Sequence, residues 1–326
     1  MALAIERGTT LRALDIFCGI GGSSAGARAA GFDIAGAIDM DPIATEGYAA
    51  NFKGAQVITG RLESVVLKKA IATVGQIDLL LASPECTNHT CAKGSSPRDE
   101  KSRATALQVV RFARAFKPRW LVLENVIHMR PWSRYGELKQ KLERLGYNIA
   151  EQVIDASDHG VPQSRRRLFI VGDRERAPRL VSSRARGRRR TVNSILDRDG
   201  TWPTSPLHAP NRAPDTLERA KRATKALGPE SSFLLVYYGT DGAGGWQPLD
   251  RPLRTITTID RFALVRPGNQ GPEMRMLQVS ELKRAMGFPD EFTLSVGTRR
   301  DRIRLLGNGV CPPVMQAVLS ALTADD

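Results

Sequence analysis

Residues 11–31 read LRALDIFCGIGGSSAGARAAG, and this stretch decides the fold class. The apolar residues 11–17 have the length of a buried strand, and glycines follow at positions 19, 21 and 22. Small residues then predict a helix that Gly31 ends. Glycines in such a turn let the backbone approach a bound ligand closely, and the start of the helix offers free N–H groups. The stretch therefore predicts the strand, glycine turn and helix of an α/β protein.

A second strand is predicted over residues 32–38, and Asp39 follows it. An acid about 20 residues after the glycines is where nucleoside-binding sheets place the carboxylate that holds ribose hydroxyls. The dinucleotide fingerprint requires a third glycine where this chain has Ser24, which argues against a nicotinamide cofactor. A cofactor without a pyrophosphate, such as S-adenosylmethionine, has no such requirement. The alternative is a turn that packs tightly and binds nothing.

Two reactive side chains follow predicted buried strands. Residues 78–82 (DLLLA) lead into Ser83, Pro84, Glu85 and Cys86, and residues 120–123 (WLVL) lead into Glu124. Ligands of open α/β sheets bind at the carboxyl edge of the strands, so this thiol and this carboxyl are expected to face one crevice. The alternatives are an inert buried cysteine and a glutamate that only ends its strand.

A third polar segment, residues 160–172 (GVPQSRRRLFIVG), carries three consecutive arginines. If it forms a strand, the two-residue period places Arg165 and Arg167 on one face. Two guanidiniums on one face suit a phosphate or a carbonyl oxygen, although arginines at the start of a strand are often only solvated.

The composition indicates a polyanionic partner. The 326 residues carry a net charge of +14 with a pI near 10.1, and 41% hydrophobic residues suffice for a normal core. The four cysteines form no Cys-x-x-Cys pair and have no histidine at zinc-ligand spacing, so neither a disulfide framework nor a metal site is expected. Neither a secretory leader nor a membrane span is expected.

From residue 173 onward the composition of the sequence changes. A basic run covers residues 184–190, residues 201–214 are rich in proline, and residues 237–248 form a glycine-rich loop. Such segments often hold the loops that read DNA, and the alternative is a flexible surface insertion. Residues 251–265 are expected to be rich in β-structure, Ser280 to cap a short helix, and Pro312 to open a final helix.

The order of these motifs resembles that of the bacterial and phage DNA cytosine-5 methyltransferases. The residues that carry the resemblance are 15–22 (DIFCGIGG), the Pro/Cys strand end at Cys86, residues 124–126 (ENV), residues 163–167 (QSRRR) and residues 307–310 (GNGV). Together they span nearly the whole chain, and only the middle segment is unmatched.

The resemblance implies a Rossmann-like, mostly parallel sheet with helices on both faces and a smaller β-rich target-recognition domain. The catalytic and cofactor-binding domain would comprise residues 1–172 and 300–326, with residues 173–299 forming the recognition domain and hinge. S-adenosylmethionine would be bound by Asp15, Phe17, Gly19, Gly21, Gly22, Asp39, Met40 and Asn308. Catalysis would rest on Cys86, Glu124, Arg165 and Arg167.

The other partner implied by the resemblance is double-stranded DNA. Candidate DNA contacts are Thr87, Asn88, Lys93, Gln163, Arg184, Arg186, Arg188, Arg189 and Arg190. The protein is expected to be a cytoplasmic monomer, with a cognate restriction endonuclease as a further partner. An RNA cytosine methyltransferase of the same architecture and a DNA-binding homologue without activity remain open alternatives.

Three positions depart from the family pattern. Glu85 stands where the family has proline before the cysteine, Thr87 where it has glutamine, and Arg61 where it has the aspartate that contacts adenine. These departures concern the loop around the target base and the adenine contacts.

Overall fold

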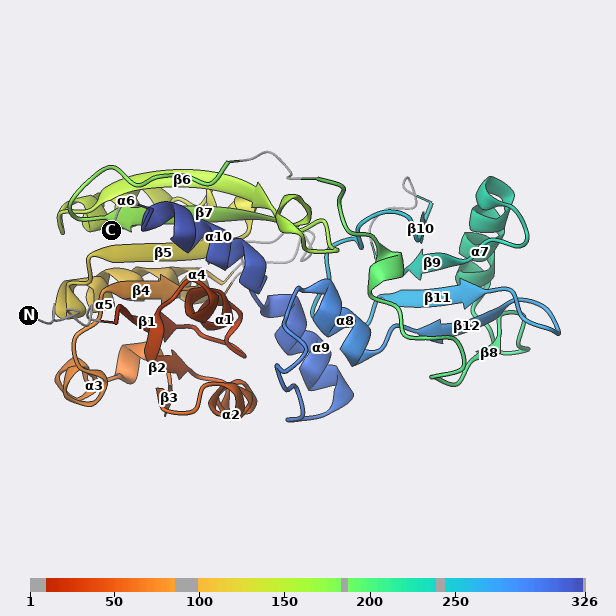
Figure 1. The fold of residues 1–326 in the computed structure, drawn as a ribbon, viewed down its shortest axis with the longest axis horizontal. Coiled ribbons are helices and arrows are strands. Elements are labelled where there is room, and N and C mark those ends of the chain that lie inside the picture. The colour runs from red at the N-terminus through yellow and green to blue at the C-terminus, as the bar shows by residue number, and fades with distance from the viewer. Residues whose placement is uncertain (1–9, 86–98, 183–186, 239–243, 325–326) are drawn as a thin grey trace, which may run out of the picture.

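The computed structural model describes residues 10–85, 99–182, 187–238 and 244–324. Two sheets lie at opposite ends of the molecule, and helices occupy the region between them (Figure 1). The fold class predicted from the sequence is confirmed.

The larger sheet has seven strands in the order β3-β2-β1-β4-β5-β7-β6. Its strands are β1 (Arg12–Ile16), β2 (Asp33–Asp39), β3 (Gln56–Thr59), β4 (Leu79–Ala82), β5 (Trp120–Asn125), β6 (Asn148–Asp155) and β7 (Arg166–Asp173). The first five in this order pair in parallel, whereas β7 runs antiparallel to both of its neighbours. Strands β1, β4 and β5 are adjacent and parallel. The glycine turn after β1, the segment after β4 that leads to Cys86, and Glu124 near the end of β5 therefore all lie at one edge of the sheet.

Helices cover both faces of this sheet, because its strands are apolar on both sides. Helices α1 (Gly22–Ala29), α2 (Pro42–Asn51) and α10 (Pro312–Leu322) contribute to the core on one face. Helices α3 (Leu67–Val74), α5 (Gln108–Phe116) and α6 (Tyr135–Glu143) contribute to the core on the other. A short helix, α4 (Glu100–Ala104), precedes α5.

The second sheet is antiparallel, in the order β10-β9-β11-β12-β8. Its strands are β8 (Ser205–Pro206), β9 (Phe233–Val236), β10 (Trp246–Pro248), β11 (Phe262–Arg266) and β12 (Glu273–Met276). Helix α7 (Pro214–Leu227) packs on one face through small residues such as Ala220 and Ala223. Side chains of the opposite face, including Leu234 and Leu264, join the same core as α1 and α10. The two sheets are therefore connected by continuous apolar packing.

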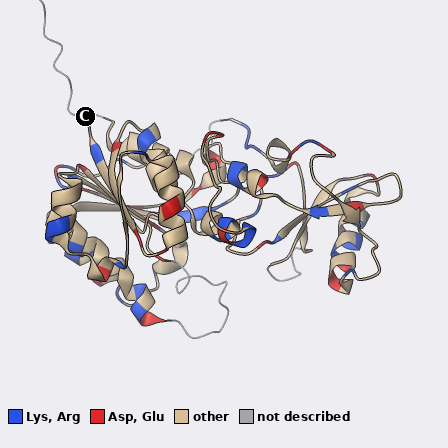
Figure 2. Ribbon diagram, turned by 90° about the horizontal axis from the view of Figure 1, so that it is seen from below, with Lys and Arg blue, Asp and Glu red and all other residues tan. Residues whose placement is uncertain are grey.

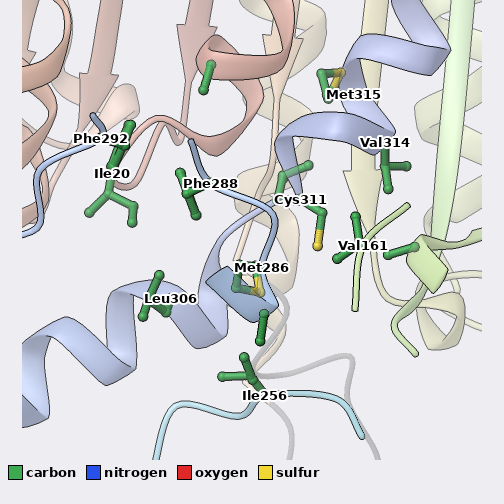
Figure 3. Packing of buried hydrophobic residues seen from close by; sticks show 14 of the residues in the cluster. Ile20, Val161, Ile256, Met286, Phe288, Phe292, Leu306, Cys311, Val314 and Met315 are labelled. Carbon is green, nitrogen blue, oxygen red and sulfur yellow. The ribbon is translucent and has the colours of Figure 1, made fainter. Parts of the chain in front are cut away.

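Helices α8 (Val279–Ala285) and α9 (Arg299–Asn308) lie between the two sheets (Figure 1). Figure 3 shows Met286, at the end of α8, between Ile256 and Cys311, with Leu306 of α9 nearby. The stretch Arg299–Leu322 is long and apolar enough to span a membrane by composition alone. Its residues belong instead to α9 and α10, which are separated at residues 309–311 and pack into the core.

Two expectations about elements were wrong. Residues 251–265 form a strand only from Phe262 onward, because the residues before it bond to neighbouring segments instead of a strand. Helix α8 begins after Gln278, whose backbone N–H is accepted by Glu281, and not after Ser280. A 3₁₀ turn over Thr105–Leu107 leads directly into α5.

Candidate active site

The glycine turn after β1 has the backbone geometry that the sequence predicted. Phe17, Gly19 and Gly21 all have positive φ, with values of 59°, 52° and 95°. The Gly19 N–H donates to Asp39 Oδ2 at 2.9 Å, and the Asp41 N–H donates to Asp39 Oδ1 at 2.9 Å. Burial raises the pKa of Asp39, although these two N–H groups oppose the shift. The turn and the acid at the end of β2 are thus held together.

Asp15 lies in β1, just before the turn, and is fully buried. Its Oδ2 accepts a hydrogen bond from Ser24 Oγ at 2.7 Å, and Ser24 Oγ is 2.6 Å from the Tyr48 hydroxyl. Burial raises the pKa of Asp15 to about 7, and among the described residues Oδ1 has no hydrogen-bond partner. Because the Asp15 side chain is fully buried and bonded to Ser24, the structure does not favour the predicted direct contact between Asp15 and a cofactor.

Two further predicted cofactor residues are solvent-accessible. Met40, next to Asp39, is 57% exposed, and Asn308 is exposed at the end of α9. The segment that carries Asn308 reaches the glycine turn: a Cβ added to Gly22 would collide with the carbonyl of Val310. Glycine at position 22 therefore permits the close approach of these two segments.

The end of β4 is anchored to both of its neighbours. Asn125 Nδ2 donates to the Pro84 carbonyl at 3.0 Å, and the Ser83 hydroxyl is 3.2 Å from the Ser23 hydroxyl of α1. Glu85 is exposed and accepts a hydrogen bond from Ser102 Oγ at 2.9 Å. The predicted site residues Cys86, Thr87, Asn88 and Lys93 lie outside the described residues.

Glu124 and Arg167 form the charged pair of the site. The Glu124 side chain lies 3.3 Å from Arg167 Nε, measured at Oε1, and the residue is only 6% exposed. This contact lacks hydrogen-bond geometry, so Oε1 has no hydrogen-bond partner among the described residues. Burial raises the pKa of Glu124, and the charges of Arg167 and Arg165 partly oppose the rise. Burial thus favours the protonated form of this carboxyl group more than it would at an exposed position.

A small pocket adjoins this pair, and both Arg165, which precedes β7, and Arg167, which lies in it, line this pocket. Its lining consists of Glu124, Ile154, Ala156, Arg165, Arg167, Phe169, Val310, Cys311 and Val314. Burial raises the pKa of the Cys311 thiol to about 11, so this cysteine is neutral. Sequence reasoning missed Cys311 and Asn125 as site residues, although each directly follows a recognised motif residue.

The predicted DNA contacts fall into two groups. Gln163 is fully buried: its Nε2 donates to the Ala285 carbonyl and its Oε1 accepts the Ile256 N–H, which leaves it inaccessible to DNA in this structure. Arg188, Arg189 and Arg190 are exposed, and Arg189 pairs with Asp158. Arg184 and Arg186 lie outside the described residues. Lys and Arg occur on both lobes and between them (Figure 2).

The departure at position 61 also has a defined location. Arg61 follows β3 and its side chain is 67% exposed, 3.9 Å from Glu63. No cluster of three His, Cys, Asp or Glu side chains suited to a metal ion occurs within the described part of the chain.

The nucleoside-type turn, the acid beyond it and the buried Glu124–Arg167 pair at one sheet edge define a group-transfer enzyme of the α/β class. The family of C-5 cytosine-specific DNA methylases matches residues 11–324, and the chain belongs to this family. The predicted family and enzyme class, DNA (cytosine-5)-methyltransferase, are confirmed.

Similar proteins include bacterial type II methyltransferases. M.XorII of Xanthomonas oryzae pv. oryzae is 26% identical over 352 aligned residues, which cover 94% of this chain and 82% of that protein. M.NlaX of Neisseria lactamica is 25% identical, with 95% of this chain and 96% of that protein covered. M.AquIA of Picosynechococcus is 32% identical over 176 residues, which cover 49% of this chain and 71% of that protein.

Solved structures share the fold. One is a putative DNA modification methyltransferase encoded within a prophage (E. coli), with a TM-score of 0.67 and 21% identity over 96% of this chain and 99% of that one. Another is the S. pombe Dnmt2 methyltransferase, with a TM-score of 0.67 and 19% identity over 96% of this chain and 98% of that one.

Proposed function

We propose that this protein transfers a methyl group from S-adenosylmethionine to carbon 5 of cytosine within a short, specific duplex DNA sequence. Cys86 would form a temporary covalent bond to carbon 6 of a cytosine flipped out of the helix. The observation that carries the proposal is the buried Glu124–Arg167 pair at 3.3 Å. Glu124 lies on β5, next to the strand β4 that leads to Cys86, and Arg167 lies on β7, on the other side of β5.

The residues around the glycine turn fit the cofactor. A Cβ added to Gly19 would meet no atom within 4 Å, so the turn has an open side, and the Asp39 carboxylate lies against it. Asp39 would hold the ribose hydroxyls, Met40 would lie against the adenine, and Asn308 would close the pocket. When bound, the cofactor supplies an electrophilic methyl group on a sulfonium.

Carbon 5 of cytosine is a poor nucleophile, and the protein side chains would make it reactive. Addition of the Cys86 thiolate to carbon 6 moves the ring electrons toward carbon 5. Glu124 would donate its proton to ring nitrogen 3, which makes carbon 6 more electrophilic, and its raised pKa favours the protonated form needed. Arg167 would bind the cytosine carbonyl oxygen. After methyl transfer, loss of the carbon 5 proton to a base expels Cys86 and restores the ring.

This chemistry requires the base to leave the stacked duplex, at a cost of about a few kcal/mol. We assign recognition of the sequence to residues 173–299, which carry the second sheet, and phosphate contacts to the exposed basic run that includes Arg188 and Arg190. A cytoplasmic role in a bacterial or phage-infected cell, as a monomer beside a cognate restriction endonuclease, is part of the same proposal.

Trapping of the covalent intermediate tests the mechanism. In the presence of S-adenosylmethionine, duplex DNA carrying 5-fluorocytosine should form an adduct with the protein that survives denaturation. After methyl transfer, carbon 5 carries fluorine in place of the proton that a base would remove, so Cys86 is not expelled. The adduct should be absent with Cys86→Ser and with an unsubstituted duplex. Adduct formation that is undiminished in Cys86→Ser would refute the assigned nucleophile.

Bisulfite sequencing of plasmid DNA exposed to the protein measures activity and recognition sequence together. The expected result is complete conversion resistance at one short sequence. Methylation of tRNA in place of duplex DNA would support the RNA alternative, and DNA binding with no methylation of either would support an inactive homologue.

A further inference from the structure

Arg165 differs from Arg167 in what its guanidinium contacts. Arg165 is 2% exposed, and it donates to the backbone carbonyls of Ile256 at 3.1 Å, Gly307 at 2.9 Å and Gly309 at 2.8 Å. A guanidinium has five N–H donors in a fixed plane, and at least three of them are directed to these carbonyls. The side chain is therefore engaged with the protein itself.

The backbone of Arg165 is also held in place. Its N–H donates to Asp155 Oδ1 at 3.1 Å, and its carbonyl accepts the Ala156 N–H at 3.0 Å. The neighbouring Ser164 Oγ donates to Asp155 Oδ2 at 2.9 Å. Asp155 thus fixes the chain from which the guanidinium extends.

Two of the three carbonyls flank a predicted cofactor residue. Gly307 and Gly309 stand on either side of Asn308, and the next residue, Val310, has its carbonyl against Gly22 of the glycine turn. The position of Asn308 relative to the turn therefore depends on bonds that Arg165 makes on both of its sides.

The third carbonyl belongs to the segment that leads into the second sheet. The Ile256 N–H is accepted by Gln163 Oε1 at 2.9 Å, and Gln163 also donates to Ala285 at the end of α8. A Cβ added to Gly307 would collide with the Thr257 carbonyl, so the two segments that Arg165 joins also touch directly. Figure 3 shows Ile256 below Met286, and Leu306, which precedes Gly307, to the side of Met286.

We propose that Arg165 is a positioning residue, which fixes Asn308 at the cofactor pocket and joins residues 307–309 to the segment at Ile256 that leads into the second sheet. In this role it contacts neither cytosine nor phosphate. The inference rests on the proposed function, in which residues 307–310 complete the cofactor site. Lysine keeps the charge but has a single ammonium, which cannot reproduce a planar fork directed at three carbonyls.

The decisive measurement is cofactor affinity in the absence of DNA. Arg165→Lys and Arg165→Met should each weaken the binding of S-adenosylmethionine about ten-fold or more, because a charged hydrogen bond to a buried carbonyl is lost in both. In steady-state assays with saturating DNA, KM for the cofactor should rise by a larger factor than kcat falls. Binding of DNA alone should keep the salt dependence of the wild-type protein.

The opposite pattern would overturn the proposal. A phosphate ligand at position 165 predicts unchanged cofactor affinity in Arg165→Met and a salt slope reduced by about one. Cofactor binding needs no methyl transfer, so this result is independent of the adduct and bisulfite experiments. Failure of those experiments alongside weakened cofactor binding would refute the reaction but not the role of Arg165.

Arg302 provides a matched control. It also donates to three carbonyls, those of Ser295, Val296 and Gly297, but all three belong to one local loop. Arg302→Lys should lower stability without changing cofactor affinity. If Arg302→Lys lost cofactor affinity to the same extent, the effect at Arg165 would be explained by general destabilisation, and the proposal would be overturned.

A second variant keeps the test decisive if the Arg165 variants do not fold. Gly307→Ala leaves the arginine intact but pushes the Thr257 carbonyl away from the 307–309 turn. It should reproduce the loss of cofactor affinity. Wild-type affinity in a folded Gly307→Ala protein would overturn the proposal.

Discussion

Replacement of Gly26 by alanine tests whether the close packing of α1 against α10 keeps the glycine turn after β1 in place. The added Cβ would lie 2.5 Å from the Pro312 carbonyl oxygen, 2.6 Å from Met315 Cβ and 2.9 Å from Gln316 N. All three distances are shorter than van der Waals contact, and two of the three atoms are backbone atoms of α10, which cannot rotate away. The two helices must therefore move apart.

The net change in the free energy of unfolding is the sum of two opposing contributions. Alanine is favoured over glycine in a helix interior by about 1 kcal/mol. Overpacking of a well-packed core costs about 1–3 kcal/mol, and rigid backbone neighbours place this site at the upper end. We expect Gly26→Ala to lose about 2 kcal/mol of unfolding free energy and to bind the cofactor more weakly, because the glycine turn begins α1.

Gly136→Ala is the matched control. Gly136 lies in α6, where an added Cβ would meet no atom within 4 Å, so only the helix term acts and stability should stay equal or rise by up to about 1 kcal/mol. Urea denaturation followed by circular dichroism gives the midpoints of both variants. If Gly26→Ala unfolds at the same midpoint as Gly136→Ala, the argument from close helix packing is refuted.

Three further predictions concern charged groups. Burial raises the pKa of Asp15 to about 7, so between about pH 4 and 7 the folded protein keeps a proton that the unfolded chain has lost. Stability should fall as pH rises through this window, by up to about 4 kcal/mol, and Asp15→Asn should flatten the curve; parallel wild-type and variant curves in urea denaturation would contradict this. Glu124→Gln should lower kcat by about 10²–10⁴-fold with DNA affinity retained, because glutamine has no acidic proton to donate; single-turnover methylation rates and gel-shift affinities test it, and a wild-type rate would exclude Glu124 as the acid. Replacing Arg188 and Arg190 by glutamine should reduce the slope of log K against log salt by about one per arginine that contacts a phosphate; an unchanged slope would make the run a solvated linker.

The larger sheet could be predicted because each of its motifs is a short, continuous stretch of sequence. The runs before the glycine turn, before Ser83 and before Glu124 are short, apolar and bounded by polar residues, which is enough to predict buried strands. Their side-by-side order in the sheet then placed Asp39 and Glu124 at one edge.

The second sheet was less predictable for physical reasons. Helix α7 was missed although Leu217, Ala220, Ala223 and Leu227 recur at helical spacing, because the residues it buries completely, Thr216, Ala220 and Ala223, are small and give only a weak hydrophobic signal. The strand expected from residue 251 onward begins only at Phe262, since Leu253 and Ile256 form their backbone bonds with Pro162 and Gln163 instead.

The roles of individual polar side chains depended on distant partners. Gln163 and Arg165 were assigned to DNA and substrate from their motif, yet their hydrogen-bond partners lie 91 to 144 residues further along the chain. Local sequence carries no information on such contacts. Burial of these two side chains could be seen only once the helices between the sheets were in place.

The packing of α10 on α1 has a consequence for synthesis of the protein. The first strand, turn and helix precede, by about 290 residues, the backbone that covers Gly22 and Gly26, so they leave the ribosome well before it. The proposed cofactor pocket therefore cannot be completed before residues 310–316 have been synthesised, and until then the early segments keep apolar surface uncovered. Loss of α10 would remove the backbone that packs against Gly26, so the proposed cofactor site would stay incomplete.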